Sequence, residues 1–293
     1  MISIIICSKL PDAIGKLKQN IDETIGSSYE LIIVDNSQGG HSIFSAYNEG
    51  LKSAKGNFLC FMHEDILFHS NDWGQKLEVY FDKFPNVGMV GVAGTHFLPK
   101  MPAAWWDTEM RSGQLLQGRT VDGVYKVVNE EWIDYRKNPT QVASVDGLWM
   151  CCRRALFDSI RWDDITFKGF HCYDTDISLQ VWKAGYEVHI FWDVIIEHKS
   201  PGVANELFHQ SLDTLYKKWC YALPIVKGVE LTESEMRARI RIAELRHELY
   251  EKEYCLKEIC RSQEYRWGQR LLHRPLLFFK NMRYFLRCML RKT

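Results

Sequence analysis

Four short apolar runs alternate with helix-length segments over the first hundred residues, and this alternation constrains the fold more than any other feature of the sequence. The runs are nearly free of polar residues, which is typical of parallel strands buried on both faces of a sheet. The segments between them are partly amphipathic, with Pro11 near one start and Gly56 just past one end, where helices accept these residues. This order predicts an α/β fold with a mostly parallel sheet flanked by helices. The predicted strands are residues 2–7, 31–34, 58–62 and 87–93, and the predicted helices are 11–24, 43–55 and 72–84.

The remainder of the 293-residue chain changes character along its length. Residues 97–143 have no clear period and are rich in Pro, Gly and Trp, so we expect a long irregular segment that binds a ligand or covers one. Order returns with an apolar run at 145–152, a helix at about 174–184 and strands at 188–191 and 194–197. Thr232 and Glu235 form a capping box that opens a helix to about Cys260. We predict an α/β domain over 1–202, a helical extension over 203–265 and a tail over 266–293.

Charge and cysteine content exclude several classes of protein. Lys plus Arg and Asp plus Glu both number 37, so the chain as a whole is not a nucleic-acid binder by charge. Nine cysteines without a C-x-x-C pair, two of them adjacent in an apolar run, indicate buried thiols in a reducing compartment. The apolar run that follows Met1 is too short for a signal peptide or a membrane span. We therefore expect a cytoplasmic protein.

The last 33 residues differ from the rest, because residues 261–293 hold nine Lys and Arg against Glu264 alone. A helix through this segment would gather Lys280, Arg283, Arg287 and Arg291 on one side, opposite a face made by Phe278, Met282, Phe285 and Met289. A basic amphipathic helix of this kind is typical of segments that lie on an anionic membrane surface. We expect peripheral attachment to the inner face of the membrane, and the alternative is a helix packed on the core with a solvated face.

Polar residues follow the predicted strands, where ligands of parallel α/β sheets bind. Strand ends are occupied by Ser8, by Asp35, by the triplet from His63 to Asp65 and by His198. Taken singly, each is also a common turn or cap residue. The glycines of residues 88–94 do not match the dinucleotide fingerprint, and no P-loop is present, so a dehydrogenase is disfavoured and a P-loop ATPase is excluded.

Five blocks in order make the sequence similar to the family-two inverting glycosyltransferases, which have the GT-A nucleotide-sugar fold. They cover residues 1 to about 200. The resemblance implies a transfer of sugar from a nucleotide donor, UDP-linked in our expectation, to a hydroxyl acceptor. The blocks are residues 2–7, 30–37, 45–50, 54–65 and 170–179.

The resemblance also implies roles for individual residues around the donor. Asp35 matches the acid that hydrogen-bonds the nucleotide base, and Ser8, Asn48, His63 and Glu64 are further candidates for binding the nucleotide. Asp65 matches the last Asp of the D-x-D motif, which coordinates Mn²⁺ or Mg²⁺ on the diphosphate. His63 stands in place of the first Asp, and imidazole shifts the metal preference toward Mn²⁺. His198 is a candidate second metal ligand, with a turn histidine as the alternative.

Asp174 matches the general base that deprotonates the acceptor hydroxyl, and Tyr173 stands where the family often has Glu. Asp174 could instead serve as an N-cap, with Asp176 complementing the helix dipole. Trp105 and Trp106 are candidates for stacking on a sugar ring, and the alternative is packing of the loop onto the body. Asp146 and Asp176 are weaker candidates for the acceptor site.

These inferences predict an inverting, metal-dependent glycosyltransferase that acts on a glycan or a lipid-linked glycan, as in cell-surface polysaccharide synthesis. The 232–260 helix is a candidate surface for a homodimer. Two alternatives stay open: a degenerate homologue that binds a nucleotide sugar or tethers partners, and a sugar nucleotidyltransferase. The second is disfavoured because residues 8–11 lack the glycine- and arginine-rich loop expected after its first strand.

Overall fold

The computed structural model describes residues 1–122, 124–132, 140–200 and 205–262. The chain divides into two compact units, Met1–Ile242 and Ala243–Thr293. The first unit extends past residue 202, and the predicted division of the chain at residues 202 and 265 stays a prediction. The predicted basic tail, residues 266–293, lies outside the described residues.

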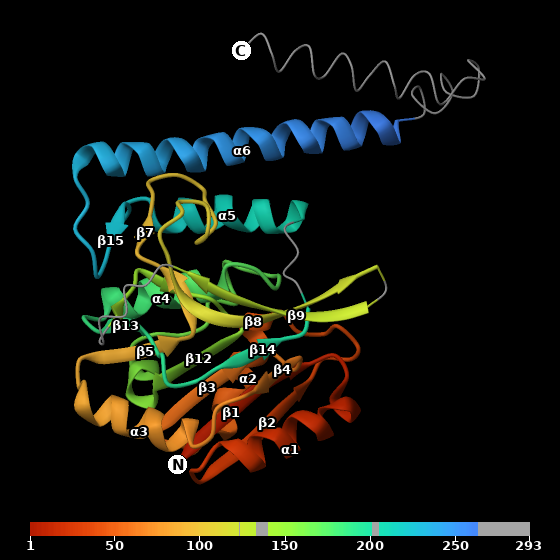
Figure 1. The fold of residues 1–293 in the computed structure, drawn as a ribbon, viewed down its shortest axis with the longest axis vertical. Helices are drawn as coiled ribbons and strands as arrows, with labels where there is room; N and C mark the ends of the chain where they lie inside the picture. The colour runs from red at the N-terminus through yellow and green to blue at the C-terminus, as the bar shows by residue number, and fades with distance from the viewer. Residues whose placement is uncertain (123, 133–139, 201–204, 263–293) are drawn as a thin grey trace. The chain divides into compact units, whose positions relative to one another are not determined.

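A seven-stranded sheet forms the centre of the first unit, in the order β10-β13-β5-β12-β3-β1-β2 (Figure 1). Strand β1 is parallel to β2 and β3, and β13 is parallel to β5, which confirms the predicted mostly parallel sheet. Strand β12 runs antiparallel between β3 and β5, and β10 is an antiparallel edge strand. The strands are β1 (Ile2–Ser8), β2 (Tyr29–Asp35), β3 (Phe58–Met62), β5 (Val87–Gly91), β10 (Thr140–Gln141), β12 (Trp149–Arg153) and β13 (Glu187–Ile190).

Helices cover both faces of this sheet, which explains why its central strands β1, β3, β5 and β12 are buried and largely apolar. Successive side chains of a strand point to opposite faces, so Ile4 packs with the core cluster under α1 and α3 while Ile5 packs with the cluster under α2, α4 and α5. The three predicted helices of the first hundred residues are confirmed, with a 3₁₀ turn at Pro11–Ile14 leading into the first. The helices are α1 (Gly15–Thr24), α2 (Ile43–Ser53), α3 (Trp73–Lys83), α4 (Tyr173–Lys183) and α5 (Glu206–Trp219), and a second 3₁₀ turn spans Arg154–Asp158.

A second sheet has the order β11-β6-β8-β14-β4, with β9 paired to β8 as a long hairpin. The predicted run 87–93 divides between β5 of the first sheet and β6 of the second, and the predicted strands 188–191 and 194–197 likewise belong to β13 and β14 of different sheets. A two-stranded pair, β7 (Phe97–Leu98) and β15 (Ile225–Val226), lies beside them. The second sheet comprises β4 (Ile66–Phe68), β6 (Ala93–Thr95), β8 (Arg111–Val121), β9 (Val124–Trp132), β11 (Ser144–Val145) and β14 (Ile196–His198).

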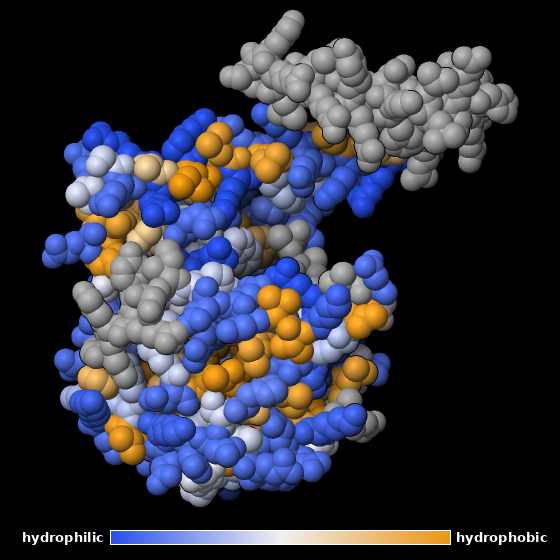
Figure 2. Space-filling model, in the orientation of Figure 1, coloured by the Kyte–Doolittle hydropathy of each residue, from blue (hydrophilic) through white to orange (hydrophobic). Residues whose placement is uncertain are grey.

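The expectation that residues 97–143 are irregular is wrong, because β8 and β9 occupy 11 and 9 of these residues. Most residues of β9 are exposed whichever face they occupy, and Val124, Val127 and Val128 are among the exposed apolar side chains. Figure 2 shows apolar surface at the position of this hairpin. A strand without a buried face has no alternating pattern, so its period could not be recognised in the sequence.

Helix α6 (Glu233–Arg261) confirms the predicted capping box. The Thr232 N–H donates to Glu235 Oε2 at 2.8 Å, and the Glu235 N–H donates to Thr232 Oγ1 at 3.3 Å. Leu245, Leu249 and Leu256 are exposed along this helix, and its role in dimerisation stays a prediction. Among the described residues, no helix is long and apolar enough to cross a membrane.

We expect Gly94→Ala to destabilise the first unit by about 1–3 kcal/mol, the usual cost of inserting a methyl group into a packed site. A Cβ at Gly94 would lie 2.2 Å from the carbonyl oxygen of Ser144, in the strand paired with β6. Urea unfolding measures the loss. Gly40→Ala is the control, because its Cβ would meet nothing within 4 Å. Equal stability of the two variants would contradict the close β6–β11 pairing.

Candidate functional site

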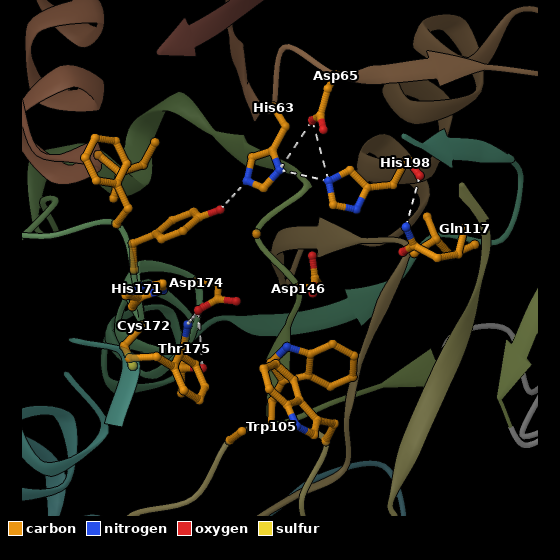
Figure 3. Close-up of a pocket in the computed structure, with 18 of the residues that line it drawn as sticks. His63, Asp65, Trp105, Gln117, Asp146, His171, Cys172, Asp174, Thr175 and His198 are labelled. Atoms are coloured by element: carbon orange, nitrogen blue, oxygen red, sulfur yellow. Dashed lines mark hydrogen bonds and ion pairs between the residues drawn. The ribbon is translucent and has the colours of Figure 1, made fainter. Parts of the chain in front are cut away.

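A cavity of about 640 Å³ opens at the carboxyl end of β3, within the range of ordinary ligand pockets. It receives side chains from the loops after β1 and β3, from the β8–β9 hairpin, from β14 and from helices α4 and α5. Figure 3 shows the carboxylates and imidazoles arranged around it. Eight residues singled out from the sequence line this cavity: His63, Glu64, Asp65, Trp105, Trp106, Asp146, Asp174 and His198.

His63, Asp65 and His198 form a group whose ligand atoms all lie within 4.8 Å of one another. His63 Nδ1 is 3.3 Å from His198 Nε2, and Asp65 Oδ1 is 3.5 Å from that same Nε2. His198 belongs to strand β14 itself, so the alternative of a turn histidine does not apply. Two imidazole nitrogens and a carboxylate oxygen suit a divalent transition metal such as Mn²⁺ better than Mg²⁺. The donor set therefore fits the metal expected from the sequence.

The surroundings of Asp65 in this group favour its ionised form. Burial alone raises the pKa of Asp65, but the hydrogen bond and charge of His198, together with the Ser200 hydroxyl, outweigh it and hold the pKa well below its usual value. Ser200 Oγ donates to Asp65 Oδ2 at 2.5 Å. Asp65 is therefore ionised at neutral pH, as a metal ligand must be.

Asp174 lies in the first turn of α4, not at its N-cap, so the N-cap interpretation is wrong. Cys172 occupies the N-cap with the left-handed angles φ 62° and ψ 9°, a conformation that is uncommon for residues other than glycine. Burial, and next the negative charge of Asp146, raise the pKa of Asp174 to about 7. Its Oδ1 accepts a hydrogen bond from the Thr175 N–H at 2.7 Å. A carboxyl group with this pKa can exchange a proton near neutral pH.

The tryptophan pair both packs the loop and lines the cavity. Trp105 is 7% exposed and meets Trp106 and Trp132 edge to face, while Trp106 stacks on Phe208 of α5 at 5.4 Å. Trp105 Nε1 is buried and has no hydrogen-bond partner among the described residues. Both interpretations offered from the sequence are thus compatible with their positions.

Four of the predicted residues do not line the cavity. Ser8 donates to Glu64, which also accepts from the backbone N–H groups of Lys9 and Leu10 and so holds the loop after β1. Asp35 is exposed, and the Ser37 N–H lowers its pKa. Asn48 donates to the Trp162 carbonyl at 2.8 Å.

Asp176, the fourth, is 1% exposed on α4. It accepts from Trp219 Nε1 at 2.7 Å and pairs with Lys218 Nζ at 2.7 Å, which links α4 to α5. Its neighbourhood is that of a structural residue. The roles assigned to these four side chains stay predictions.

The opposite wall of the cavity was missed by sequence reasoning. The β8–β9 hairpin contributes Arg111, Gln117, Glu130 and Trp132, and α5 contributes Phe208 and Leu212. Gln117 Nε2 also donates to the carbonyl oxygens of His198 and Ser200, which fixes the end of β14. Trp132 is the residue of this wall that the sequence could most easily have suggested as a ligand-binding side chain. Nothing in the sequence, however, indicates which strand carries it to the cavity.

We expect Asp174→Asn to raise the melting temperature at pH 8 and to change it little at pH 4. The pKa of Asp174 rises from an ordinary 3.8 to about 7 on folding, so the folded chain loses stability as the pH increases through this window and the buried carboxyl group ionises. Asn keeps the acceptor oxygen and removes the charge, for a gain of at least about 1 kcal/mol at pH 8. Circular dichroism at the two pH values measures it, with the exposed Asp158→Asn as control. A gain that is the same at both pH values would show that the charge of Asp174 is not the cause.

Two curated relatives are similar to the chain at low identity. The streptomycin biosynthesis protein StrF of Streptomyces griseus is 28% identical over 153 residues, which cover 51% of this chain and 50% of that protein. The chain therefore spans about half the length of this relative. A protein of Fuscovulum blasticum described as ATP synthase subunits region ORF 6 is 25% identical over 200 residues, 65% of this chain and 72% of that protein.

Solved structures show a partial likeness. GalNAc-T7, solved with UDP, GalNAc and Mn²⁺, superposes with a TM-score of 0.49 at 11% identity, over 76% of this chain and 50% of that one. TarS of S. aureus superposes with a TM-score of 0.48 at 13% identity, over 84% of this chain and 71% of that one.

The family comparison covers far more of this chain than StrF does. A family model described as "Glycosyltransferase like family" matches residues 3–240 of this chain, from β1 to the first turns of α6. This range includes the whole lining of the cavity. It confirms the resemblance inferred from the five sequence blocks, and the chain belongs to this glycosyltransferase family.

Proposed function

We propose that the chain is a metal-dependent glycosyltransferase that moves a sugar from a UDP-linked donor to a hydroxyl group of a glycan or lipid-linked acceptor, with inversion at the anomeric carbon. The observation that carries this proposal is that one cavity holds two separate chemical devices. One is the group of His63, Asp65 and His198, and the other is the partly buried carboxyl group of Asp174. A single displacement needs both, since charge leaves at one end of the reacting centre and a proton leaves at the other.

The donor end of the cavity is the end with the three ligands. A divalent ion held by His63, Asp65 and His198 would neutralise the negative charge that develops on the departing diphosphate. Lys9 also lines this cavity, after β1, and adds a positive charge for phosphate oxygens. Glu64 fixes the backbone on both sides of Lys9 and so positions it.

The acceptor end is the end with Asp174. The Asp174 carboxylate takes the proton of the acceptor hydroxyl group while the oxygen of that hydroxyl group forms a bond to the anomeric carbon of the donor sugar. The bond from that carbon to the diphosphate oxygen breaks in the same step, and the nucleoside diphosphate leaves with the electron pair. Attack from the face opposite to the leaving group inverts the anomeric configuration. A pKa of about 7 makes Asp174 a stronger base than an ordinary carboxylate and still allows it to ionise near neutral pH.

Aromatic side chains favour a sugar as the acceptor. Trp105, Trp106 and Trp132 line the cavity, and the C–H face of a sugar ring suits such surfaces. The buried Trp105 Nε1 is a donor that a sugar oxygen would satisfy. Attachment to an anionic membrane depends on residues 266–293, which lie outside the described residues, and stays a prediction together with the cytoplasmic location.

Asp65→Ala and His198→Ala should each weaken the Mn²⁺-dependent binding of UDP by at least about tenfold, because each removes a ligand that the metal needs. Isothermal titration with UDP, in Mn²⁺ and in a chelator, measures the effect. His247→Ala is the control, because this histidine lies on α6 and pairs with Glu251. Wild-type affinity for UDP that is the same with Mn²⁺ and with the chelator would overturn the metal assignment.

Asp174→Asn should lower the rate of transfer by about 10²–10⁴-fold, the usual contribution of a general base, and should leave UDP affinity unchanged. In the wild type, transfer should increase with pH through about 7, because the base acts only when it is ionised. Steady-state rates with a UDP-sugar panel, from pH 5 to pH 9, test both statements.

Asp146→Asn is the matched variant for this experiment. Its negative charge raises the pKa of Asp174, so its removal should shift the rising limb of the pH profile toward lower pH. Nearly full transfer by Asp174→Asn would contradict the assignment of the base. A wild type that binds UDP with Mn²⁺ and transfers no sugar from any donor would instead favour the binding-only homologue.

A further inference from the structure

The two ring nitrogens of His63 face different neighbours. Nδ1 lies 3.3 Å from His198 Nε2 and 3.9 Å from Asp65 Oδ1, so this nitrogen belongs to the group of three ligands. Nε2 lies 2.6 Å from the hydroxyl oxygen of Tyr173. Figure 3 shows Asp65 and His198 together on one side of the His63 ring. The second ring nitrogen of His63 thus contacts a tyrosine that is not itself a member of the group.

We propose that Tyr173 is a positioning residue that holds His63 in the tautomer and orientation needed to bind a divalent metal through Nδ1. The inference rests on the proposed function, because it concerns the metal proposed there. It adds a residue that contacts His63 and is not one of the three ligands.

A neutral imidazole ring has one N–H hydrogen, on either Nδ1 or Nε2, and its position decides which nitrogen can bind a metal. A nitrogen that binds a metal must offer its lone pair, so the hydrogen has to be on the other nitrogen. The Tyr173 oxygen is the acceptor that receives this hydrogen from Nε2. Hydrogen bonds of this kind to the second nitrogen orient metal-binding histidines and raise their basicity. Without the oxygen, Nε2 loses its acceptor, and the competing tautomer, with hydrogen on Nδ1, becomes more favourable.

Tyr173 is itself held by dense packing, so its hydroxyl group cannot follow a moving histidine. It is 7% exposed and contacts the rings of Phe44, Tyr47 and Trp162 at centroid distances of 6.0–6.3 Å. The opposite side is closed by Gly147, where a Cβ would lie 2.3 Å from the Tyr173 hydroxyl oxygen. The absence of a side chain at Gly147 therefore makes room for this hydrogen bond.

The position of Tyr173 also links the proposed metal group to the proposed base. It is the first residue of α4, and Asp174 is the second. The helix that carries the proposed base thus also supplies the group that orients a metal ligand. A displacement of this helix end would disturb both ends of the reaction together.

The experiment measures Mn²⁺ binding directly, by electron paramagnetic resonance of free Mn²⁺ in titrations of the full chain without substrate. Tyr173→Phe removes the hydroxyl oxygen and keeps the ring, and it should weaken Mn²⁺ binding by about 10–100-fold, as for other orienting partners of metal-binding histidines. Tyr47→Phe is the matched control. Tyr47 packs in the same aromatic cluster, and its buried hydroxyl group has no hydrogen-bond partner among the described residues, so Mn²⁺ affinity should be unchanged.

A double-mutant cycle tests whether Tyr173 acts through His63. In a His63→Asp background the tautomer no longer exists, so adding Tyr173→Phe should have no further effect on Mn²⁺ affinity. A merely structural role would give the same loss in both backgrounds. Gly147→Ala is a second perturbation, which should displace the hydroxyl group and weaken Mn²⁺ binding with the same dependence on His63.

The outcomes separate this inference from the function on which it rests. Wild-type Mn²⁺ affinity in a folded Tyr173→Phe overturns the role of Tyr173 and leaves the metal-dependent transferase intact. An equal loss in Tyr47→Phe, or a loss that persists in the His63→Asp background, also overturns it. A wild type that binds no Mn²⁺ overturns the metal assignment and the inference together.

Discussion

Burial of the seven-stranded sheet between two layers of helices is the constraint on which the site depends. Because both faces are covered, the central strands are largely apolar, and polar side chains collect where these strands leave the core. His63 follows β3 at this edge, and its backbone N–H is held by the Leu148 carbonyl at 3.0 Å. The rigid edge then presents the residues of a loop with little conformational freedom, as a preorganised site requires.

The cavity concentrates negative charge at some cost to stability. Its lining includes five carboxylates, Glu64, Asp65, Glu130, Asp146 and Asp174, against the cations Lys9 and Arg111. Glu64 and Glu130 have partners in the Ser8 hydroxyl and in Arg119. Asp146 and Asp174 repel each other, and this repulsion adds to the larger effect of burial in raising the pKa of Asp174. A buried charge of this kind destabilises the fold and is useful only where a reaction needs a base, which is the usual conflict between stability and activity.

The second sheet and α5 determine how the cavity is closed on its far side. The hairpin β8–β9 brings Trp132 against Trp105, and α5 brings Phe208 against Trp106. The Asn205 side chain caps α5 by accepting from the Phe208 N–H at 3.0 Å, which fixes the first turn of the helix. Most of this wall is separate from the residues that form the metal group and the base, except that Gln117 of β8 also holds the end of β14 through the carbonyl oxygen of His198. Acceptor choice is expected to depend on this wall.

The amino-acid sequence by itself determined the alternation of strands and helices, the capping box of α6, and the polar residues at the ends of β1, β2 and β3. Local periodicity and cap chemistry act within a few residues, so they can be recognised without the fold. Only the tertiary structure decided that β5 and β6 separate into two sheets, that residues 111–132 form a hairpin, and that His63 joins Asp65 and His198. Strand β9 has no buried face to impose a pattern, and the ligand group unites residues 135 positions apart in the sequence. Such distant pairings depend on the packing of whole layers, which no short stretch of sequence encodes.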